Sequence, residues 1–183
     1  MLDSLPEGVN HAGLVALGGK LYLVGGYREN TFTPTGAVRI YDLAARRWSE
    51  GAPMPTPRGA LAVAVLEGRI HAIGGTAAGA ASLDPEQHHP GADAASVGTH
   101  EVYDPATNTW SRRAPLPTPR NHMGAAVVGG KIYVPAGRVG NDFTLTVHEV
   151  YDPATDRWSA APPIPTGRSG IAVVALGGRV YVF

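Results

Sequence analysis

The sequence contains no cysteine, which excludes disulfide bonds and thiolate chemistry. It also has no excess of charge: 15 basic residues balance 15 acidic ones, and no run of like charge is longer than a pair. This balance argues against binding to nucleic acid or to an anionic membrane surface. No apolar stretch is long enough to span a bilayer, and no segment has the spacing of an amphipathic helix. A cysteine-free chain without a signal peptide pattern leaves the cellular compartment open.

What the chain does contain is one motif in three copies. Tyr-Asp is followed by Trp, seven residues after the Tyr, in YDLAARRW (41–48), YDPATNTW (103–110) and YDPATDRW (151–158). A proline-rich stretch ending in arginine follows each Trp. A pattern of this length indicates an internal repeat. The 24 glycines and 16 prolines fall at repeated positions, so they mark turns rather than disorder.

Each repeat predicts four short strands. In the first repeat they are residues 11–17, 20–24 and 37–41 and a strand around Trp48, with a hairpin turn at Gly18–Gly19. The second repeat predicts strands at 60–66, 69–73, 100–103 and 109–114, and the third at 123–128, 131–135, 148–151 and 157–160. A fourth repeat begins at Gly170 and reaches its second strand. Four antiparallel strands in about fifty residues indicate a blade of an all-β propeller.

The repeats divide the chain into units 1–58, 59–120, 121–168 and 169–183, which together form one partial propeller domain. The first strand of each unit is rich in Ala, Val and Gly, which suits the crowded inner strand beside a propeller axis. The Tyr and Trp of each motif supply the large apolar area with which one blade packs on the next.

Paired glycines follow the second strand at 25–26 and 74–75, and the Tyr and Trp of the motif come later in each repeat. In this arrangement the chain resembles the kelch-repeat family; the third copy departs from it with Pro135–Ala136–Gly137. The resemblance implies a kelch-type β-propeller of four-stranded antiparallel blades, here three blades plus the first two strands of a fourth. Kelch propellers have six or seven blades, so the chain is interpreted as a fragment, or alternatively as a half-propeller that a second copy completes. Open blades also predict self-association.

The resemblance further implies a ligand-binding face, formed by the loops between blades and the loops after the glycine pairs. Carried over by position, its residues are Asn10, His11, Tyr27, Arg28, Thr76, Asn121, His122, Arg138 and Ser169. Such a ring of donors and aromatics suits a polar or acidic peptide. Alternatively, the two asparagines only cap turns, and His11 and His122 begin the inner strands. Arg28 and Arg138 have no counterpart in the second repeat, so the repeat does not by itself require them.

Residues that recur with the tryptophans are expected to serve the fold, and they are Arg58, Arg120, Arg168, His100 and His148. His71 stands where the other repeats place tyrosine. It is interpreted as a substitution in the packing layer, with a buried functional histidine as the alternative.

The second repeat carries an insertion, residues 76–99, which is expected to be a solvated loop or a lid over the ligand face. Its Asp84, Glu86, His88 and His89 match no established metal-site spacing. No metal or cofactor is therefore expected.

Catalytic signatures are missing: there is no G-x-S-x-G elbow, no Walker loop and no H-E-x-x-H. The copper enzymes that resemble galactose oxidase use a cysteine, which this chain lacks. Binding of a protein or peptide, without chemistry, is the function that the resemblance favours. The alternatives are a carbohydrate-directed propeller (sugar-binding, or similar to a sialate mutarotase or epimerase) and a scaffold between other domains.

Overall fold

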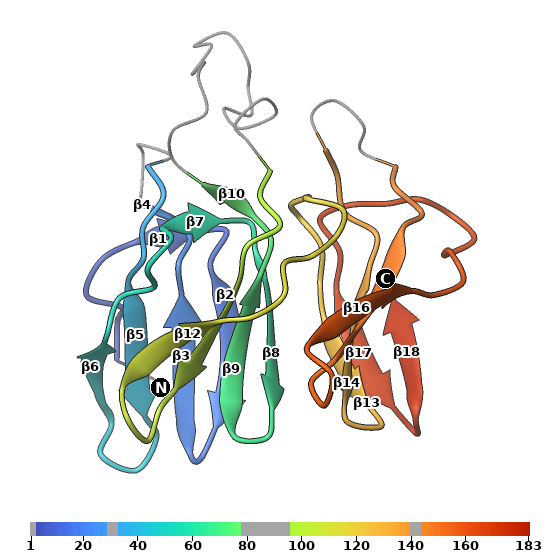
Figure 1. The fold of residues 1–183 in the computed structure, drawn as a ribbon. Helices are drawn as coiled ribbons and strands as arrows, with labels where there is room; N and C mark the ends of the chain where they lie inside the picture. The colour runs from blue at the N-terminus through green and yellow to red at the C-terminus, as the bar shows by residue number, and fades with distance from the viewer. Residues whose placement is uncertain (1–2, 29–32, 78–95, 140–143) are drawn as a thin grey trace, which may run out of the picture.

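The computed structural model describes residues 3–28, 33–77, 96–139 and 144–183. Within these ranges all regular secondary structure is β-strand, in agreement with the all-β prediction (Figure 1). The described residues include no helix with the length and apolar character needed to cross a membrane.

Three four-stranded antiparallel sheets follow one another along the chain. The first consists of β2 (Gly13–Leu17), β3 (Lys20–Val24), β5 (Val38–Asp42) and β6 (Arg47–Gly51). The second consists of β8 (Ala62–Leu66), β9 (Arg69–Ile73), β11 (His100–Asp104) and β12 (Thr109–Arg112). The third consists of β13 (Ala126–Val128), β14 (Lys131–Pro135), β15 (His148–Asp152) and β16 (Arg157–Ala160). Within each sheet, neighbours in sequence are neighbours in space, as expected for propeller blades.

Shorter pairs of strands join or follow these sheets. β17 (Val173–Leu176) and β18 (Arg179–Val182) form the two-stranded start of a fourth. β1 (Val9–Asn10) pairs with β4 (Tyr27–Arg28), and β7 (Arg58–Gly59) pairs with β10 (Thr76–Ala77). The exact limits of the four sequence units remain a prediction.

The strand starts differ from expectation at two histidines. His11 and His122 do not begin the inner strands but have left-handed backbones, with φ of 52° and 54°. The strands begin two and four residues later, at Gly13 and Ala126. A left-handed residue turns the chain sharply, so the histidines lie at the corner between a proline-rich loop and an inner strand.

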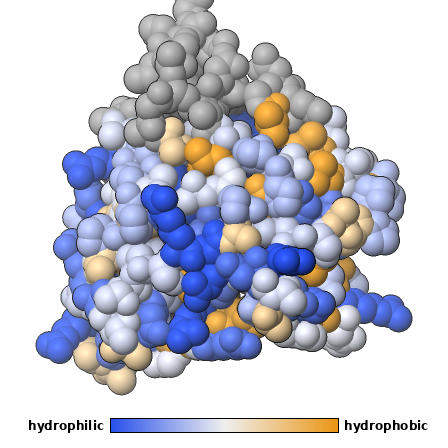
Figure 2. Space-filling model, in the orientation of Figure 1, coloured by the Kyte–Doolittle hydropathy of each residue, from blue (hydrophilic) through white to orange (hydrophobic). Residues whose placement is uncertain are grey.

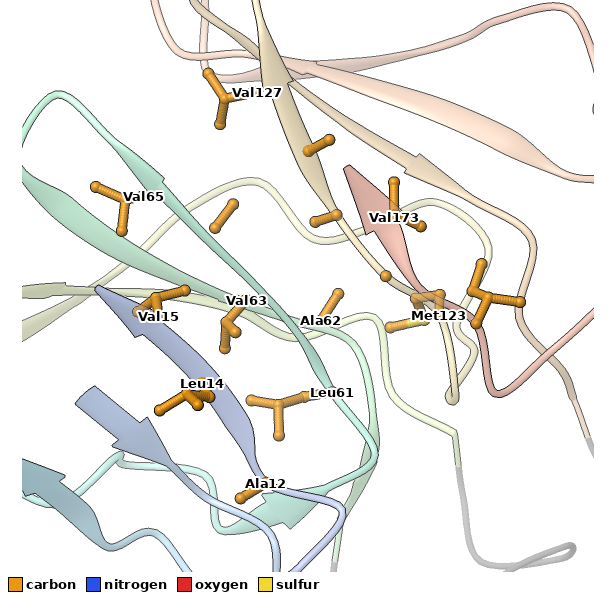
Figure 3. A pocket seen from close by; sticks show the side chains of 15 residues that line it. Ala12, Leu14, Val15, Leu61, Ala62, Val63, Val65, Met123, Val127 and Val173 are labelled. Atoms are coloured by element: carbon orange, nitrogen blue, oxygen red, sulfur yellow. The ribbon is translucent and has the colours of Figure 1, made fainter. Parts of the chain in front are cut away.

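The inner strands of neighbouring sheets lie against each other, which explains their small residues. A Cβ added at Gly13 would lie 2.4 Å from Cγ1 of Val63, and one at Gly124 would lie 2.5 Å from Cγ2 of Val173. The strands β2, β8, β13 and β17 therefore approach closely around the cavity of Figure 3. Small inner-strand residues are a packing requirement of this geometry.

The hydrophobic core lies between the sheets rather than within one of them. One cluster joins Tyr22, Val24 and Val38 of the first sheet to Ile70, Ala72 and Tyr103 of the second, with Met54, Leu61 and Trp110 beside them. The other joins Ala62, Ala64, Leu66 and Ile73 of the second sheet to Ile132, Val134 and Tyr151 of the third, with Leu116, Met123 and Trp158 beside them. Each sheet is thus buried by its neighbour, as in other repeat architectures.

The tyrosine–tryptophan motif clamps the backbone of the preceding sheet. Tyr103 and Trp110 face each other across β11 and β12. The indole N–H of Trp110 donates to the carbonyl of Ala52 at 2.8 Å, and the N–H of Ala52 donates to Oδ1 of Asn108 at 2.6 Å. The Tyr103 hydroxyl donates to the same Oδ1 at 2.7 Å. Two side chains of the second repeat, Trp110 and Asn108, thereby satisfy both polar groups of Ala52, which directly follows the first sheet, and Tyr103 holds Asn108 in place.

The clamp recurs with small changes. In the third sheet Trp158 donates to the Ala114 carbonyl at 2.8 Å, while Asp156 accepts the Ala114 N–H at 3.0 Å and the Tyr151 hydroxyl at 2.7 Å. In the first sheet Trp48 donates to the Asp3 carbonyl at 3.2 Å. There the carboxylate of Asp3 accepts the hydrogen bond from the Tyr41 hydroxyl. It does so because Arg46 stands two positions before Trp48, where the other repeats have Asn or Asp.

A buried ion pair fixes the first and the second proline-rich loop to the sheet that follows it. Arg58 is fully buried; its Nη1 lies 2.5 Å from Oε2 of Glu101, and its other N–H groups donate to the carbonyls of Ala72 and Gly74 at 2.9 Å. Arg120 is equally buried and repeats the arrangement with Glu149 in the third sheet. The expected structural role of these arginines is therefore visible in their contacts.

The first sheet reverses the two charges. Val9 and Arg39 stand where the other units place the arginine and the glutamate, and Glu7 stands at the position of Thr56. Arg39 is buried and pairs with Glu7. The exchange preserves a bond between loop and strand although all three residues differ.

Asn108→Ala is expected to lower the free energy of unfolding by about 1–3 kcal/mol, because the Ala52 N–H and the Tyr103 hydroxyl lose their acceptor. Asn108→Asp is the matched control, since aspartate does the same work at position 156. Urea unfolding would measure the free energy of unfolding of both variants, and equal values for Asn108→Ala and Asn108→Asp would contradict the clamp.

Arg58→Met is expected to destabilise the chain by about 3–5 kcal/mol, because it leaves the Glu101 carboxylate buried without its partner. The double variant Arg58→Met with Glu101→Leu should recover part of that loss. Urea denaturation of the two variants and of Glu101→Leu closes a double-mutant cycle, in which strict additivity would rule out the coupling.

Candidate functional site

The structure brings the candidate residues together in pairs where one sheet connects to the next. Asn10 pairs with Tyr27 in the β1–β4 ribbon, Thr76 pairs with Gly59 in the β7–β10 ribbon, and Asn121 forms a bridge with Arg138. The loop between blades and the loop after the glycine pair therefore meet at each junction. Arg28 is exposed at the end of its ribbon, beside Val9, and Ser169 is partly buried next to the left-handed Gly170.

Arg138, His122 and Asn121 form one hydrogen-bonded group. The guanidinium of Arg138 donates from Nε to Oδ1 of Asn121 at 3.1 Å and from Nη2 to Nε2 of His122 at 3.1 Å. Because an arginine can only donate, Nε2 of His122 accepts, and the proton of a neutral ring is on Nδ1. That Nδ1–H donates to the same Asn121 oxygen at 2.5 Å. The contacts thus assign one tautomer to the imidazole and hold the guanidinium in place.

Two aromatic rings from the first junction, those of His11 and Tyr27, extend this group. The imidazole of His11 packs edge-on against the phenol of Tyr27, with centroids 5.6 Å apart, and against the imidazole of His122, at 5.0 Å. The Tyr27 ring lies directly over Gly59, where an added Cβ would come within 2.6 Å of it. Gly59 therefore has a clear role: it leaves room for the tyrosine.

The group lies at the mouth of the central cavity. The N–H groups of Ala60, His122 and Gly170 donate at 2.9 Å to the carbonyls of His11, Ala60 and His122, respectively. These corner residues thus form a head-to-tail chain of backbone hydrogen bonds from sheet to sheet. The residues that follow them, Ala12, Leu61, Met123 and Ile171, line an apolar cavity of about 500 Å³ (Figure 3). A rim of polar side chains therefore lies beside an open channel that is lined by apolar side chains.

The charge of the site is positive. The nine candidate residues include two arginines and no carboxylate. Burial lowers the pKa of the Arg138 guanidinium, and the nearby Tyr27 partly offsets this fall. Burial raises the pKa of the Tyr27 phenol, and the charge of Arg138 partly offsets this rise. An arginine stays charged in any protein environment, so this cation is held with little access to water.

Both ends of the insertion in the second repeat are attached to this face. Thr76 bridges to Ser96, and Nδ2 of Asn121 donates to the Ser96 hydroxyl at 2.8 Å. Asp84, Glu86, His88 and His89 lie outside the described residues. Among the described residues, no three His, Asp or Glu side chains are grouped so that they could bind a metal.

Sequence reasoning missed two features. The corner histidines are left-handed, a conformation that sequence could have suggested only through Gly170 at the equivalent position. The clamp residues Asn108 and Asp156 were also missed, although both precede a motif tryptophan by two residues. That recurrence of Asn and Asp was the available signal.

Comparison with known proteins agrees with this architecture. The family model described as "KLHDC2/KLHL20/DRC7 Kelch-repeats domain" matches residues 3–183. The chain belongs to the kelch-repeat family. The tandem four-stranded sheets are thus kelch blades, and the structure is an incomplete β-propeller of three blades and the first two strands of a fourth.

Several relatives carry the same repeats in longer chains. The kelch chain is 30% identical to "Kelch-like protein terF" of Aspergillus terreus over 139 residues, which cover 73% of the chain and 28% of the relative. It is 34% identical to "Kelch-like ECH-associated protein 1A" of Danio rerio over 117 residues, 64% of the chain and 17% of the relative. The chain thus spans less than a third of the length of these relatives.

The fold is also that of a solved structure. "Structure of YjhT" superposes with a TM-score of 0.79 over 99% of the kelch chain and 59% of the other, at 20% identity. At that identity the likeness concerns the fold alone.

Away from the candidate site, two histidines form a buried pair between the second and third blades. Nδ1 of His100 lies 3.2 Å from the Ala114 carbonyl, so it carries a proton, and its Nε2 accepts from Nδ1 of His71 at 2.9 Å. The pair contacts the ring of Tyr151. Burial lowers the pKa of His71 to about 4, with Arg113 and Arg69 adding to the effect, and it lowers the pKa of His100 to about 3, with His71 adding.

Acidification is therefore expected to destabilise the chain. In the unfolded chain the histidines are protonated as the pH falls through about 6.5, whereas His71 of the folded chain is protonated only at about pH 4. The stability that the two neutral histidines contribute is complete above about pH 6.5. It is lost as the pH falls from there towards about pH 4, at up to about 1.4 kcal/mol per pH unit for each histidine. His71→Tyr, the residue of the other blades, should lower the slope of unfolding free energy against pH by up to about 1.4 kcal/mol per pH unit. An unchanged slope would contradict this assignment.

Proposed function

We propose that the chain is a binding module for a protein or peptide segment carrying acidic residues, and that the rim of the central channel is its binding face. The observation that carries the proposal is the Arg138–His122–Asn121 group, in which a guanidinium held by two side chains lies at the mouth of an apolar channel. A pre-positioned arginine binds a carboxylate without first losing much side-chain freedom.

The remaining rim residues suit the same kind of ligand. Tyr27 and His11 provide aromatic contact, and Asn10 accepts a hydrogen bond from His11 at 2.8 Å. Rigid aromatic and amide side chains around an arginine are typical of surfaces that bind peptides. The proposal is consistent with relatives whose names record association, such as the ECH-associated protein of Danio rerio.

The wider surface does not compete strongly for an acidic ligand. The chain has zero net charge, and the face seen in Figure 2 mixes hydrophilic and apolar residues. Selectivity for a carboxylate then depends on local positive charge at the rim rather than on the field of the whole chain.

A labelled peptide rich in Asp and Glu is expected to bind the chain more tightly than the same peptide with Asn and Gln, and more weakly as salt rises. Arg138→Gln should weaken binding at least tenfold, because the carboxylate loses its cation. Fluorescence anisotropy would measure both peptides.

Arg69→Gln is the matched control, since Arg69 is an exposed arginine whose partner is Asp104 on the neighbouring strand of its own sheet. Its binding should equal that of the parent chain. Equal affinity for both peptides, or no effect of Arg138→Gln, would overturn the proposal. Saturable binding of N-acetylneuraminic acid that needs Arg138, without peptide binding, would replace it with the carbohydrate alternative.

A further inference from the structure

The junction between the second and third blades contains a histidine pair at positions where the preceding junction has no titratable imidazole. The strand registers align His71 of β9 with Tyr22 of β3, and His100 of β11 with Val38 of β5. Tyr22 and Val38 belong to the hydrophobic cluster between the first and second blades. The repeat therefore does not require histidine at either position.

The geometry of the pair leaves no place for an additional proton. His100 donates from Nδ1 to the carbonyl of Ala114 at 3.2 Å, and its Nε2 accepts from Nδ1 of His71 at 2.9 Å. A proton on Nε2 of His100 would place two donors face to face, so the bond between the rings would be lost. A proton on Nε2 of His71 would create a cation in a side chain that is only 5% exposed.

The charges around the pair also oppose protonation. The charged and titratable groups that face it are Arg69 on β9, Arg113 after β12, Arg58 in the first proline-rich loop, and Tyr151 and Asp156 of the third blade. Burial raises the pKa of Tyr151, so its phenol is neutral. Burial alone would raise the pKa of Asp156, but hydrogen bonds from Tyr151 and Ala114 lower it, so this carboxylate stays ionised in mild acid. Three arginines thus outweigh one carboxylate.

The pair is built into the clamp that closes the third blade on the second. The Ala114 carbonyl accepts both from His100 and from the indole of Trp158, and Asp156 accepts the Ala114 N–H. The rings of Tyr151 and Trp158 pack on His100, with centroids 4.6 Å and 5.6 Å away. An additional charge on the imidazoles therefore acts directly on the contacts that hold the two blades together.

We propose that the His71–His100 pair makes this junction a proton-sensitive hinge, which opens on acidification while the junction between the first and second blades stays closed. Opening exposes both imidazoles to water, where each takes up a proton. Proton binding to the open form alone shifts the equilibrium towards it, as any ligand of one conformation does.

The hinge also regulates the rim of the channel. Asn121, His122 and Arg138 belong to the third blade and its connection, whereas Ser96 and His11, which contact Asn121 and His122, belong to the earlier blades. Opening separates these groups, so mild acid is expected to release an acidic peptide. This consequence rests on the proposed function, whereas the hinge itself does not.

The two junctions provide their own comparison in native-state amide hydrogen exchange. Asp156 holds the Ala114 N–H in the hinge, and Asn108 holds the equivalent Ala52 N–H in the first junction. Between pH 7 and pH 5 the protection factor of Ala114 should fall at least about tenfold, because each histidine protonated on opening adds up to about tenfold per pH unit. The protection factor of Ala52 should change less than about twofold. Equal losses at the two amides would overturn the proposal, because the chain would then open as a whole.

A double variant, His71→Tyr with His100→Val, installs the residues of the first blade in the hinge. It should abolish the fall in Ala114 protection, and His71→Tyr alone should reduce it. His148→Val makes the same histidine-to-valine change in the third blade, away from the hinge, and is the control that should leave the fall unchanged. A double variant whose Ala114 amide still loses protection as in the parent chain would overturn the proposal.

Fluorescence anisotropy with the acidic peptide tests the consequence for binding. Because the rim carries its own histidines, the parent chain and the double variant are compared at the same pH. From pH 7 to pH 5.5 the parent should lose at least about threefold more affinity than the double variant. Equal losses would overturn the regulation of binding by the hinge, whereas absence of peptide binding at pH 7 would overturn the proposed function and leave the exchange result standing.

Discussion

Each blade depends on bonds that the next blade makes to its backbone. The indole N–H of Trp110 and the side-chain oxygen of Asn108 together bind the carbonyl and the N–H of Ala52, so the end of one blade is satisfied by its neighbour. These bonds replace bonds to water at the edge of an apolar core, and each contributes modestly to stability. The hydrophobic clusters lie at the same junctions. Stability is therefore shared between blades rather than held within them.

The buried arginines act at the same junctions and bind loop to strand. Their first-blade counterpart, Arg39 with Glu7, shows that the bond is maintained even when its charges are reversed. Arg168 occupies the equivalent position in the third proline-rich loop, where its Nε donates to the carbonyl of Thr166. The junctions between blades thus use residues that obey the repeat, whereas the candidate binding face on the same scaffold uses residues that break it.

Much of this architecture could be predicted from the sequence. The spacing of Tyr103 and Trp110 fixes a hairpin in which they face each other, and paired glycines and small inner residues locate the turns and the inner strands. The role of Arg58 also followed from its recurrence. The contacts of the candidate site did not follow, because His11 and His122 are 111 residues apart in sequence and meet only through the arrangement of three blades.

The sequence by itself determined the repeat, the all-β class, the kelch resemblance and the residues that serve every blade, because each of these is a local pattern that occurs several times. Tertiary structure alone decided which of the residues that break the repeat act together. It placed Arg138 on His122 and Asn121, and it paired His71 with His100 away from water. The reason is physical: periodicity specifies what a blade is made of, whereas charge, burial and tautomer depend on which blade lies alongside.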